Sequence, residues 1–281
     1  MCGIVGIYLK TKKYEKHLGK FLSGMLDGMA TRGPDSAGFA IYTKENKNIF
    51  KYSICLNELK EKDFKKKISK FIKKIKITNY ADHIILETNE KPSKILSLLR
   101  KEIPEVSLVG YGKSINIFKQ TGNPKDVVKK FKLSSFSGTH GIGHTRMATE
   151  SAITTQGSHP YSTSEDECLV HNGSLSNHNN VRRSLIKDGQ NFNSENDTEV
   201  AAGYISNQIS KGKDLDGFYT FIAGTKDGFA LLRDEIACKP AVVAETKDYV
   251  AVASEFQAMA HLPNVNSAKI FEPKPGVVYH W

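Results

Sequence analysis

Two stretches near the end of the chain pair apolar runs with short polar turns, and they constrain the fold more than any other feature. In FYTFIAGTKDGFALLRD (218–234) two apolar runs flank a Lys-Asp-Gly turn, and KPAVVAETKDYVAVASE (239–255) repeats the pattern. Each stretch predicts a β-hairpin, because short polar turns between apolar runs connect antiparallel strands, and the first turn also contains glycine. Further strands are expected at 3–9, 39–43, 137–148 and 167–173, and helices at 17–30, 178–188 and 197–210. Hairpins with helices in two blocks predict stacked antiparallel sheets flanked by helices.

A second region, from about residue 45 to residue 136, differs from the rest of the chain in its density of lysine. We interpret this region as a small α/β insertion that interrupts a domain spanning residues 2–281. Its expected elements are helices at 57–75, 92–103 and 124–131 and short apolar strands at 83–88, 106–110 and 115–119.

Much of the formal net charge of +10 comes from the segment 57–76. Its apolar residues recur at helical spacing, which predicts an amphipathic helix with a lysine-coated outer face. Such a face could hold RNA or an acidic partner, but contact with solvent is the ordinary role of a charged helix face. The segment lacks the interleaved arginines and aromatic residues that stack nucleic-acid bases, so we expect no nucleic-acid partner.

The four cysteines, Cys2, Cys55, Cys168 and Cys238, are widely spaced and form no Cys-x-x-Cys pair. Neither a disulfide framework nor a zinc ribbon is therefore expected. No apolar run approaches the ~18–20 residues that cross a bilayer, and the N-terminus lacks the charged and apolar regions of a secretory signal. We expect a soluble protein of the cytoplasm with no membrane partner.

The chain begins MCGIVGIY, with Cys2 directly after the initiator methionine. Removal of Met1 would leave one residue that carries both a thiol and a free α-amine, which can act as nucleophile and base. The α-amine titrates near pH 7.7–8.0, so an appreciable fraction is neutral at physiological pH. The alternative is a buried strand whose second residue happens to be a small apolar side chain.

Three further segments carry candidate chemistry. Asn172 and Gly173 offer an amide NH₂ and an unobstructed backbone N–H to an oxyanion, although Asn-Gly is also an ordinary turn. Arg146, among small polar residues at a strand end, could bind a carboxylate bidentately or serve a structural role. Asp197 lies in the first turn of a helix that Asn196 and Glu199 would cap as a capping box, and it could also bind an ammonium group.

The histidines and cysteines do not indicate a metal site. His140 and His144 are four residues apart in an expected strand, which separates them by ~13 Å. Cys168 and His171 differ by an odd number of positions, so in a strand they face opposite sides. We therefore expect no metal on this chain.

Six segments occur in a distinctive order along the chain. They are MCGIVGIY, RGPDSAG (32–38), GHTRMAT (143–149), SHP (158–160), HNG (171–173) and NDTE (196–199). In this order they resemble the class II glutamine amidotransferases, which are N-terminal-nucleophile hydrolases. A finer likeness is to amidotransferase domains of glutamate synthase and to the separate amidotransferase subunits of glutamate synthase-like and N-methylglutamate synthase-like complexes. The segments that carry it are CLVHNGSLSNHN (168–179), DGFYTF (216–221), RDEIACKPAVVAET (233–246) and VASE (252–255).

The resemblance implies an α+β fold, a four-layer αββα sandwich, and hydrolysis of L-glutamine to glutamate and ammonia through a thioester on Cys2. In this interpretation Cys2 is the nucleophile and its own α-amine is the base. Asn172 and Gly173 match the oxyanion hole of the family. The position of the cysteine follows from the need to expose its amine by removing Met1.

The resemblance also implies the substrate contacts. Arg146 matches the residue that binds the α-carboxylate of glutamine, and Asp197 matches the residue that binds its α-ammonium group. Thr149 and His159 fall in segments that line the glutamine pocket. Arg32 belongs to the RGPDSAG segment, which matches a loop that closes over the substrate.

The acceptor of the ammonia is expected to be another polypeptide. Met147 follows the arginine where glucosamine-phosphate synthases carry tryptophan, which argues against that branch, and the chain ends at Trp281 without an ammonia-consuming domain. The resemblance implies a glutamate synthase-like subunit that carries FMN and an iron–sulfur cluster, with no cofactor on this chain. The insertion at 45–136 is either a docking surface for that subunit or a structural element. The alternative function is a glutamine-binding regulatory or scaffold subunit without turnover.

Overall fold

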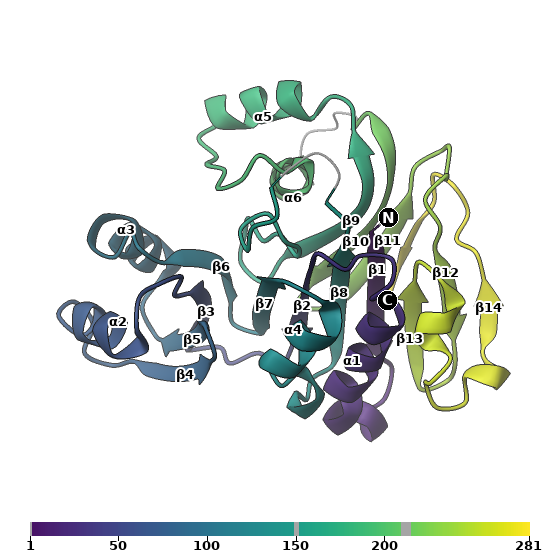
Figure 1. Cartoon of the computed structure of the whole chain (residues 1–281), viewed down its shortest axis with the longest axis horizontal. Coiled ribbons are helices and arrows are strands. Elements are labelled where there is room, and N and C mark those ends of the chain that lie inside the picture. Colours follow the sequence, from purple (N-terminus) through teal and green to yellow (C-terminus); the bar gives the residue numbers. More distant parts are fainter. Residues whose placement is uncertain (1, 149–151, 209–214) are drawn as a thin grey trace.

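Two antiparallel sheets form the centre of the computed structural model, which describes residues 2–148, 152–208 and 215–281 (Figure 1). The larger sheet contains β1 (Gly3–Leu9), β2 (Ser36–Tyr42), β7 (Ile115–Thr121), β8 (His140–Arg146), β12 (Val242–Glu245), β13 (Tyr249–Ala253) and β14 (Lys269–Phe271). Its strand order is β14-β12-β13-β1-β8-β2-β7. The smaller sheet contains β9 (Cys168–Leu175), β10 (Gly217–Thr225), β11 (Gly228–Arg233) and β15 (Val278–His280), in the order β15-β11-β10-β9.

Helices cover the outer faces of both sheets. They are α1 (Leu18–Gly28), α4 (Pro124–Lys130), α5 (His178–Lys187) and α6 (Asp197–Gln208). In Figure 1, α1 and α4 lie below the sheets and α5 and α6 above them. The helix α1 packs on β1 and β8, α6 packs on β9, and β1 and β8 contact β9 between the sheets. The predicted four-layer αββα fold is therefore confirmed.

Burial between two layers explains why the central strands are apolar along most of their length. Every residue of β2 and β8 is buried, and β1 is buried at all positions except Tyr8, which is partly exposed. Because β8 also carries His140, His144 and Arg146, this burial brings polar side chains into the core, where each needs a partner.

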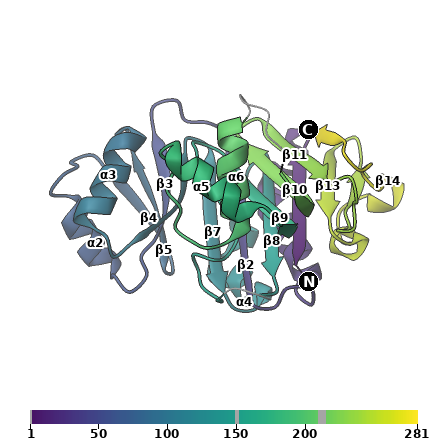
Figure 2. The same ribbon diagram turned by 90° about the horizontal axis from the view of Figure 1, so that it is seen from above.

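The predicted insertion forms a separate four-stranded sheet with the order β4-β5-β3-β6. Its elements are β3 (Phe50–Cys55), α2 (Glu61–Ile68), β4 (Lys76–Tyr80), β5 (His83–Thr88), α3 (Pro92–Glu102) and β6 (Ser107–Gly112). This insertion sheet has an apolar cluster of its own, in which Tyr52, Phe64 and Ile84 are fully buried. Figure 2 shows it at one end of the molecule, with β14 at the opposite end.

The insertion sheet is shorter than the range 45–136 expected from lysine density. The strand β7 pairs with β2 from Ser36↔Thr121 to Tyr42↔Ile115, and α4 packs on β2. Both elements therefore belong to the core formed by the two central sheets and their helices, because their apolar side chains are buried there. The helix expected at 57–75 also ends early, at Ile68, and is followed by the edge strand β4.

Short 3₁₀ helices complete the connections, at Lys12–His17, Leu133–Ser135, Phe256–Met259 and Val265–Ser267. Within the described residues, no helix combines the length and the apolar character needed to span a bilayer.

Candidate active site

Cys2 directly precedes β1 at the centre of the larger sheet. The pairing Gly3↔Thr145 places Cys2 beside Arg146, the last residue of β8. The Cys2 Sγ is partly exposed and lies 3.8 Å from the carbonyl oxygen of Met147. Burial raises the pKa of the Cys2 thiol, while the Met147 contact and the positive charges of Arg146 and Lys239 act in the opposite direction. The thiol is therefore protonated at neutral pH, and a base must take its proton before it can attack a carbon.

The segment that follows Arg146 is positioned by the RGPDSAG loop. The backbone N–H of Asp35 donates to the carbonyl of Arg146 at 3.0 Å, and the Asp35 carboxylate accepts from the N–H of Ala148 at 2.8 Å. The Arg146 side chain is 5% exposed, and its Nη1 donates to the carbonyl of Ala152 at 3.3 Å. Asp35 thus fixes the backbone on both sides of the exposed Met147, a role that its position in a glycine/proline loop did not indicate.

Arg32 is bound to the residue that would act as the nucleophile. Its Nε donates to the carbonyl oxygen of Cys2 at 3.1 Å, and its Nη1 forms an ion pair with Glu255. Glu255 follows β13, so this side chain connects the RGPDSAG loop to the far end of the sequence. The expected role of Arg32 in a loop that closes over substrate stays a prediction.

Asn172 and Gly173 lie in β9, at the edge of the smaller sheet. Asn172 is buried, and its Nδ2 has no acceptor among the described residues. Gly173 has a φ of +155°, and a Cβ there would lie 2.1 Å from the carbonyl oxygen of Phe218. The position therefore requires glycine for steric reasons, in addition to any role of its N–H group. The pair forms part of a strand rather than a turn.

Asp197 begins α6, and its carboxylate contacts Leu175, His171 and the hydroxyl of Thr198. Its Oδ2 accepts from the N–H of Leu175 at 2.9 Å, and its Oδ1 lies 3.7 Å from Nδ1 of His171. Burial raises the pKa of Asp197, but the contacts with His171 and Leu175 outweigh it, so the net pKa is lowered. The carboxylate is therefore ionised at neutral pH and can bind a cation.

The Thr198 hydroxyl joins two buried histidines next to this carboxylate. It lies 2.8 Å from Nε2 of His159 and 2.9 Å from Nδ1 of His171. His159 also stacks on His144 with ring centroids 3.8 Å apart, and Nε2 of His144 bonds to the carbonyl of His171 at 2.8 Å. Burial lowers the pKa of His144 to about 3 and lowers that of His159, so both rings are neutral.

The His159 ring is buried beside Thr198, the residue that follows Asp197. Its ring is packed between His144 and Tyr161, and only 4% of the residue is exposed. The expected role of His159 in lining the glutamine pocket stays a prediction, and the structure shows its Nε2 bonded to the Thr198 hydroxyl. Thr149, the other residue expected to line the pocket, lies outside the described residues.

The predicted capping box of α6 is only half formed. The Asn196 side chain accepts from the N–H of Thr198 at 2.8 Å, as expected for an N-cap. Glu199 reaches further back, because its carboxylate accepts from the N–H groups of Asn193 and Ser194, both at 2.8 Å. Glu199 thus fixes the segment that leads into Asp197.

Lys239 is a candidate site residue that the sequence patterns did not single out. Its backbone carbonyl accepts from the hydroxyl of Thr220 at 2.9 Å, and Thr220 pairs with Asn172 between β9 and β10. Its charge acts on the Cys2 thiol, and its Nζ lies 4.9 Å from the centre of the Phe218 ring. Only the long-range pairing of the smaller sheet brings this residue near Cys2, so no local motif could identify it.

The histidines in β8 have separate environments. His140 stacks on Tyr42 and bonds through Nε2 to the carbonyl of Thr225, whereas His144 stacks on His159. Among the described residues, no cluster of three or more histidine, cysteine or carboxylate side chains could hold a metal ion.

The arrangement combines a thiol, a cationic side chain beside it, an amide donor without an acceptor, and an ionised carboxylate. Cys2 and Arg146 come from neighbouring strands of one sheet, Asn172 from the other sheet, and Asp197 from the helix that covers it. These are the kinds of group that binding a zwitterionic molecule and attacking a carbonyl carbon within it would require.

Comparisons with known proteins agree with this chemistry. The profile of a family described as "Glutamine amidotransferase domain" matches residues 133–272. The chain is 48% identical to the "Glutamine amidotransferase-like protein GlxB" of Rhizobium meliloti (strain 1021), over 100% of this chain and 98% of that one. It is 30% identical to a "Putative glutamine amidotransferase" of Methanothermobacter thermautotrophicus, over 99% of each.

Solved structures show the same fold. The glutamine phosphoribosylpyrophosphate amidotransferase of B. subtilis, at 20% identity, matches with a TM-score of 0.63 over 99% of this chain and 47% of that chain. At this identity the likeness concerns the fold alone.

Proposed function

The chain belongs to the class II glutamine amidotransferases, enzymes with an N-terminal cysteine, and we propose that it is the glutaminase subunit of a complex that transfers ammonia to a separate synthase. The observation that carries the proposal is the position of Cys2 beside Arg146, together with an Asn172 amide in the other sheet that has no acceptor among the described residues.

In this proposal glutamine binds through its two charged groups. The guanidinium of Arg146 binds the α-carboxylate, and Asp197 binds the α-ammonium group, for which its lowered pKa keeps it ionised. His171, Leu175 and Thr198 hold Asp197 in place. The side-chain amide of glutamine then extends toward Cys2.

The chemistry begins once Met1 has been removed. The α-amine of Cys2 takes the proton of the thiol as Sγ attacks the amide carbon, and the carbonyl oxygen becomes an oxyanion. Asn172 Nδ2 and the N–H of Gly173 donate to that oxygen, and each such donor stabilises the transition state by ~2.7–4 kcal/mol. The proton then moves from the amine to the leaving nitrogen, the C–N bond breaks, and ammonia leaves a thioester on Cys2.

Hydrolysis of the thioester completes the cycle. The neutral α-amine takes a proton from water as the water oxygen attacks the thioester carbon, and the same oxyanion donors act again. The C–S bond breaks, glutamate is released, and the thiolate regains its proton. The raised pKa of the Cys2 thiol is consistent with this scheme, because it makes the base necessary.

The ammonia acceptor in this proposal is a glutamate synthase-like subunit that carries FMN and an iron–sulfur cluster and reductively aminates 2-oxoglutarate. The support is the likeness of the segments 168–179, 216–221 and 233–246 to amidotransferase parts of such complexes. This chain would supply ammonia, and the redox cofactors would be bound by its partner.

The first test measures ammonia and glutamate released from glutamine by the purified chain, after intact mass has shown that Met1 is absent. We expect equimolar products from the native chain and none from Cys2→Ala. The matched control is Cys238→Ala, which removes an exposed cysteine and should leave turnover unchanged. A processed native chain that binds glutamine without turnover would instead favour the regulatory alternative.

The second test addresses the partner. The tagged chain purified from its native cells should retain a stoichiometric subunit with the absorbance of a flavin and an iron–sulfur cluster. That complex should aminate 2-oxoglutarate with glutamine as nitrogen donor, and Cys2→Ala should restrict it to ammonium salts. Copurification with a subunit that lacks flavin would contradict the glutamate synthase-like assignment and leave the glutaminase itself untouched.

A further inference from the structure

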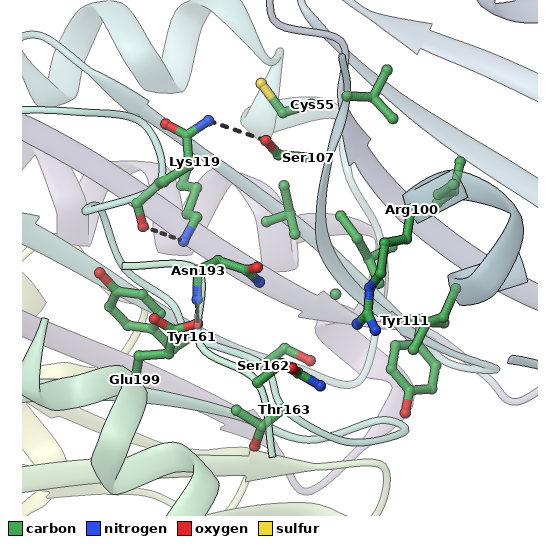
Figure 3. A pocket seen from close by; sticks show the side chains of 18 of the residues that line it. Cys55, Arg100, Ser107, Tyr111, Lys119, Tyr161, Ser162, Thr163, Asn193 and Glu199 are labelled. Atoms are coloured by element: carbon green, nitrogen blue, oxygen red, sulfur yellow. Dashed lines mark hydrogen bonds between the residues drawn. The ribbon is translucent and has the colours of Figure 1, made fainter. Parts of the chain in front are cut away.

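A cavity of about 630 Å³ lies between the insertion sheet and the core, apart from the site around Cys2 (Figure 3). One wall comes from α3 and β6 of the insertion. The other comes from β7, from the loop at 155–163 and from the segment 189–199. Cys2, Arg146, Asn172 and Asp197 are not among its lining residues. A volume of this size suits a small organic molecule.

The two walls differ in chemistry. The insertion wall is mainly apolar, with Leu96, Leu99 and Leu108 facing the cavity. The core wall is polar, and Gln156 and Asn193 line it. Figure 3 shows the Asn193 side chain inside the cavity, and no hydrogen bond of that side chain occurs among the described residues. A ligand with an apolar body and polar substituents fits such walls.

Two of the charged groups in the cavity are already occupied by the protein. The buried Lys119 ammonium donates to the carbonyls of Gln156, Ser158 and Pro160 at 3.1, 2.7 and 3.3 Å. Glu199 accepts from the backbone at 193–194 and from the Ser194 hydroxyl. Their opposite charges offset each other, so this pair adds no net charge for a ligand.

Arg100 is the remaining charged group. It projects from α3 toward the cavity beside Tyr111 (Figure 3), and within the described part of the chain it has no ion-pair or hydrogen-bond partner. A guanidinium binds carboxylate or phosphate oxygens through paired hydrogen bonds. The cavity therefore carries a net positive charge at one end of an apolar wall.

The polar wall is connected to the proposed glutamine site. Glu199 holds the segment that leads into Asp197, and Lys119 holds the carbonyls on either side of His159. Across the cavity, Nε2 of Gln156 donates to Ser107 of β6 at 3.1 Å, which joins the 155–163 loop to the insertion. A molecule bound between these walls would therefore contact the segments that position Asp197 and His159, and it could shift them.

We propose that this cavity is an effector site for a small organic anion, with Arg100 binding its carboxylate or phosphate group and the leucine wall its carbon body. Occupancy changes the affinity of the chain for glutamine through the two segments named above. The binding part of the proposal is independent of the proposed glutaminase function, and the coupling part rests on it.

Binding is tested on the full-length Cys2→Ala chain in saturating glutamine, which keeps the probes out of the glutamine site. Succinate and glycerol phosphate, titrated by calorimetry, represent the carboxylate and phosphate sources. We expect one of them to bind saturably and Arg100→Glu to weaken that binding on the order of tenfold or more. Asn193→Phe, which fills the cavity, should abolish binding, and Lys101→Glu, a neighbouring exposed position on α3 outside the lining, should not change it.

The proposal is overturned if neither probe binds, or if binding persists in both Arg100→Glu and Asn193→Phe. Coupling is tested on the active native chain by measuring KM for glutamine with and without the bound probe. A shift of several-fold that disappears in Arg100→Glu supports the effector role, and an unchanged KM at saturating probe contradicts it. Because binding is measured without turnover, failure of the effector site can be distinguished from failure of the glutaminase assignment.

Discussion

The insertion sheet and the core are both β-sheets covered by helices, but they differ in what they bury. In the insertion the fully buried side chains are mainly apolar, and its lysines lie outside. The core buries histidines, an arginine, an asparagine and a glutamate around β8, β9 and α6. Burying polar groups is costly unless each is paired.

The unpaired atoms show where that cost is concentrated. Among the described residues, buried ring or amide nitrogens without partners occur together at His144, His159, His171 and Asn172, whereas the insertion sheet has one, on His83. The comparison indicates that hydrophobic burial mainly stabilises the insertion. In the core, buried polar atoms without partners lower the stability of the fold, but they can bind the polar atoms of a ligand. Hydrogen bonds that join the two regions include those of Ile117 with Ser53, Lys130 with Asp82, and Gln156 with Ser107.

Removing Phe64 tests whether the insertion sheet is an independent unit. This ring is fully buried in the cluster of the insertion, so Phe64→Ala should cost ~3–5 kcal/mol. Hydrogen exchange should show that β3 to β6 open while β1 and β8 stay protected, and glutaminase activity should persist. Phe39→Ala, at a fully buried ring that packs on Phe131 and Phe136 of the core, should instead destabilise the core. Loss of protection throughout the chain in Phe64→Ala would show that the two regions unfold together.

Asn172→Ala should have the largest effect on catalysis after loss of Cys2. If Nδ2 stabilises the oxyanion, kcat falls by ~10²–10³, equivalent to ~2.7–4 kcal/mol, with little change in KM. Steady-state kinetics of ammonia release would measure both constants. Asn116→Ala is the matched control, because Asn116 is a buried asparagine on β7 outside the site. A raised KM with unchanged kcat would indicate that Asn172 binds the substrate rather than the transition state.

Acid should destabilise the core more steeply than the insertion sheet. Burial lowers the pKa of His140 to about 4 and of His144 to about 3, and lowers that of His159, whereas the insertion contains only His83 with such a shift. Lowered histidine pKa values mean that the unfolded chain binds more protons. Stability is therefore complete above pH ~6.5 and declines as the pH falls toward the folded-state values.

The expected loss at pH 5 is ~2 kcal/mol per histidine. Urea unfolding at pH 7 and pH 5 would measure it, and His140→Gln should remove about one such increment from the pH dependence. His140 is chosen because it packs on Tyr42 and Thr225, away from the proposed glutamine contacts. An unchanged pH dependence in His140→Gln would show that this ring is not held neutral by the fold.

The same contrast explains what the sequence could and could not predict. The hairpins and the central strands were predictable because apolar runs and turns are local, and the confirmed β10–β11 hairpin turns at Lys226–Asp227. The C-terminal limit of the insertion was not predictable, because β7 has the same composition as its neighbours. Only its pairing with β2 assigns it to the core. The lysine-rich sequence before β4 also has helical spacing of its apolar residues, so it predicted a longer helix and did not indicate the edge strand that follows.

The candidate site divides in the same way. Recognisable local segments contain four of the candidate residues, Cys2, Arg146, Asn172 and Asp197. The order of these segments was therefore enough to predict that the four residues belong to one site. The positive charge of Lys239 partly offsets the burial that raises the pKa of Cys2, and Glu255 forms an ion pair with Arg32, although each pair of residues is separated by most of the chain length. The partners of Glu199 depend on the loop before α6, which no helix-capping rule describes.

Thr198→Val should have the smallest effect on glutamine turnover. It tests whether the Thr198 hydroxyl positions the Asp197 carboxylate. The change removes the hydroxyl between His159 and His171, which also lies 3.3 Å from the Asp197 carboxylate. A less well positioned Asp197 should raise KM for glutamine about fivefold to tenfold, equivalent to ~1 kcal/mol, with kcat nearly unchanged.

Two further variants separate this role from a general loss of stability. Thr198→Ser keeps the hydroxyl and should restore the native KM. Thr88→Val removes a comparably buried hydroxyl from the insertion, where it donates to the carbonyl of Lys74 at 3.0 Å. That control should cost ~1 kcal/mol of stability and leave KM unchanged. If Thr88→Val raised KM as much as Thr198→Val, the buried polar network of the core would have no special connection with glutamine, and the contrast between the two regions would concern stability alone.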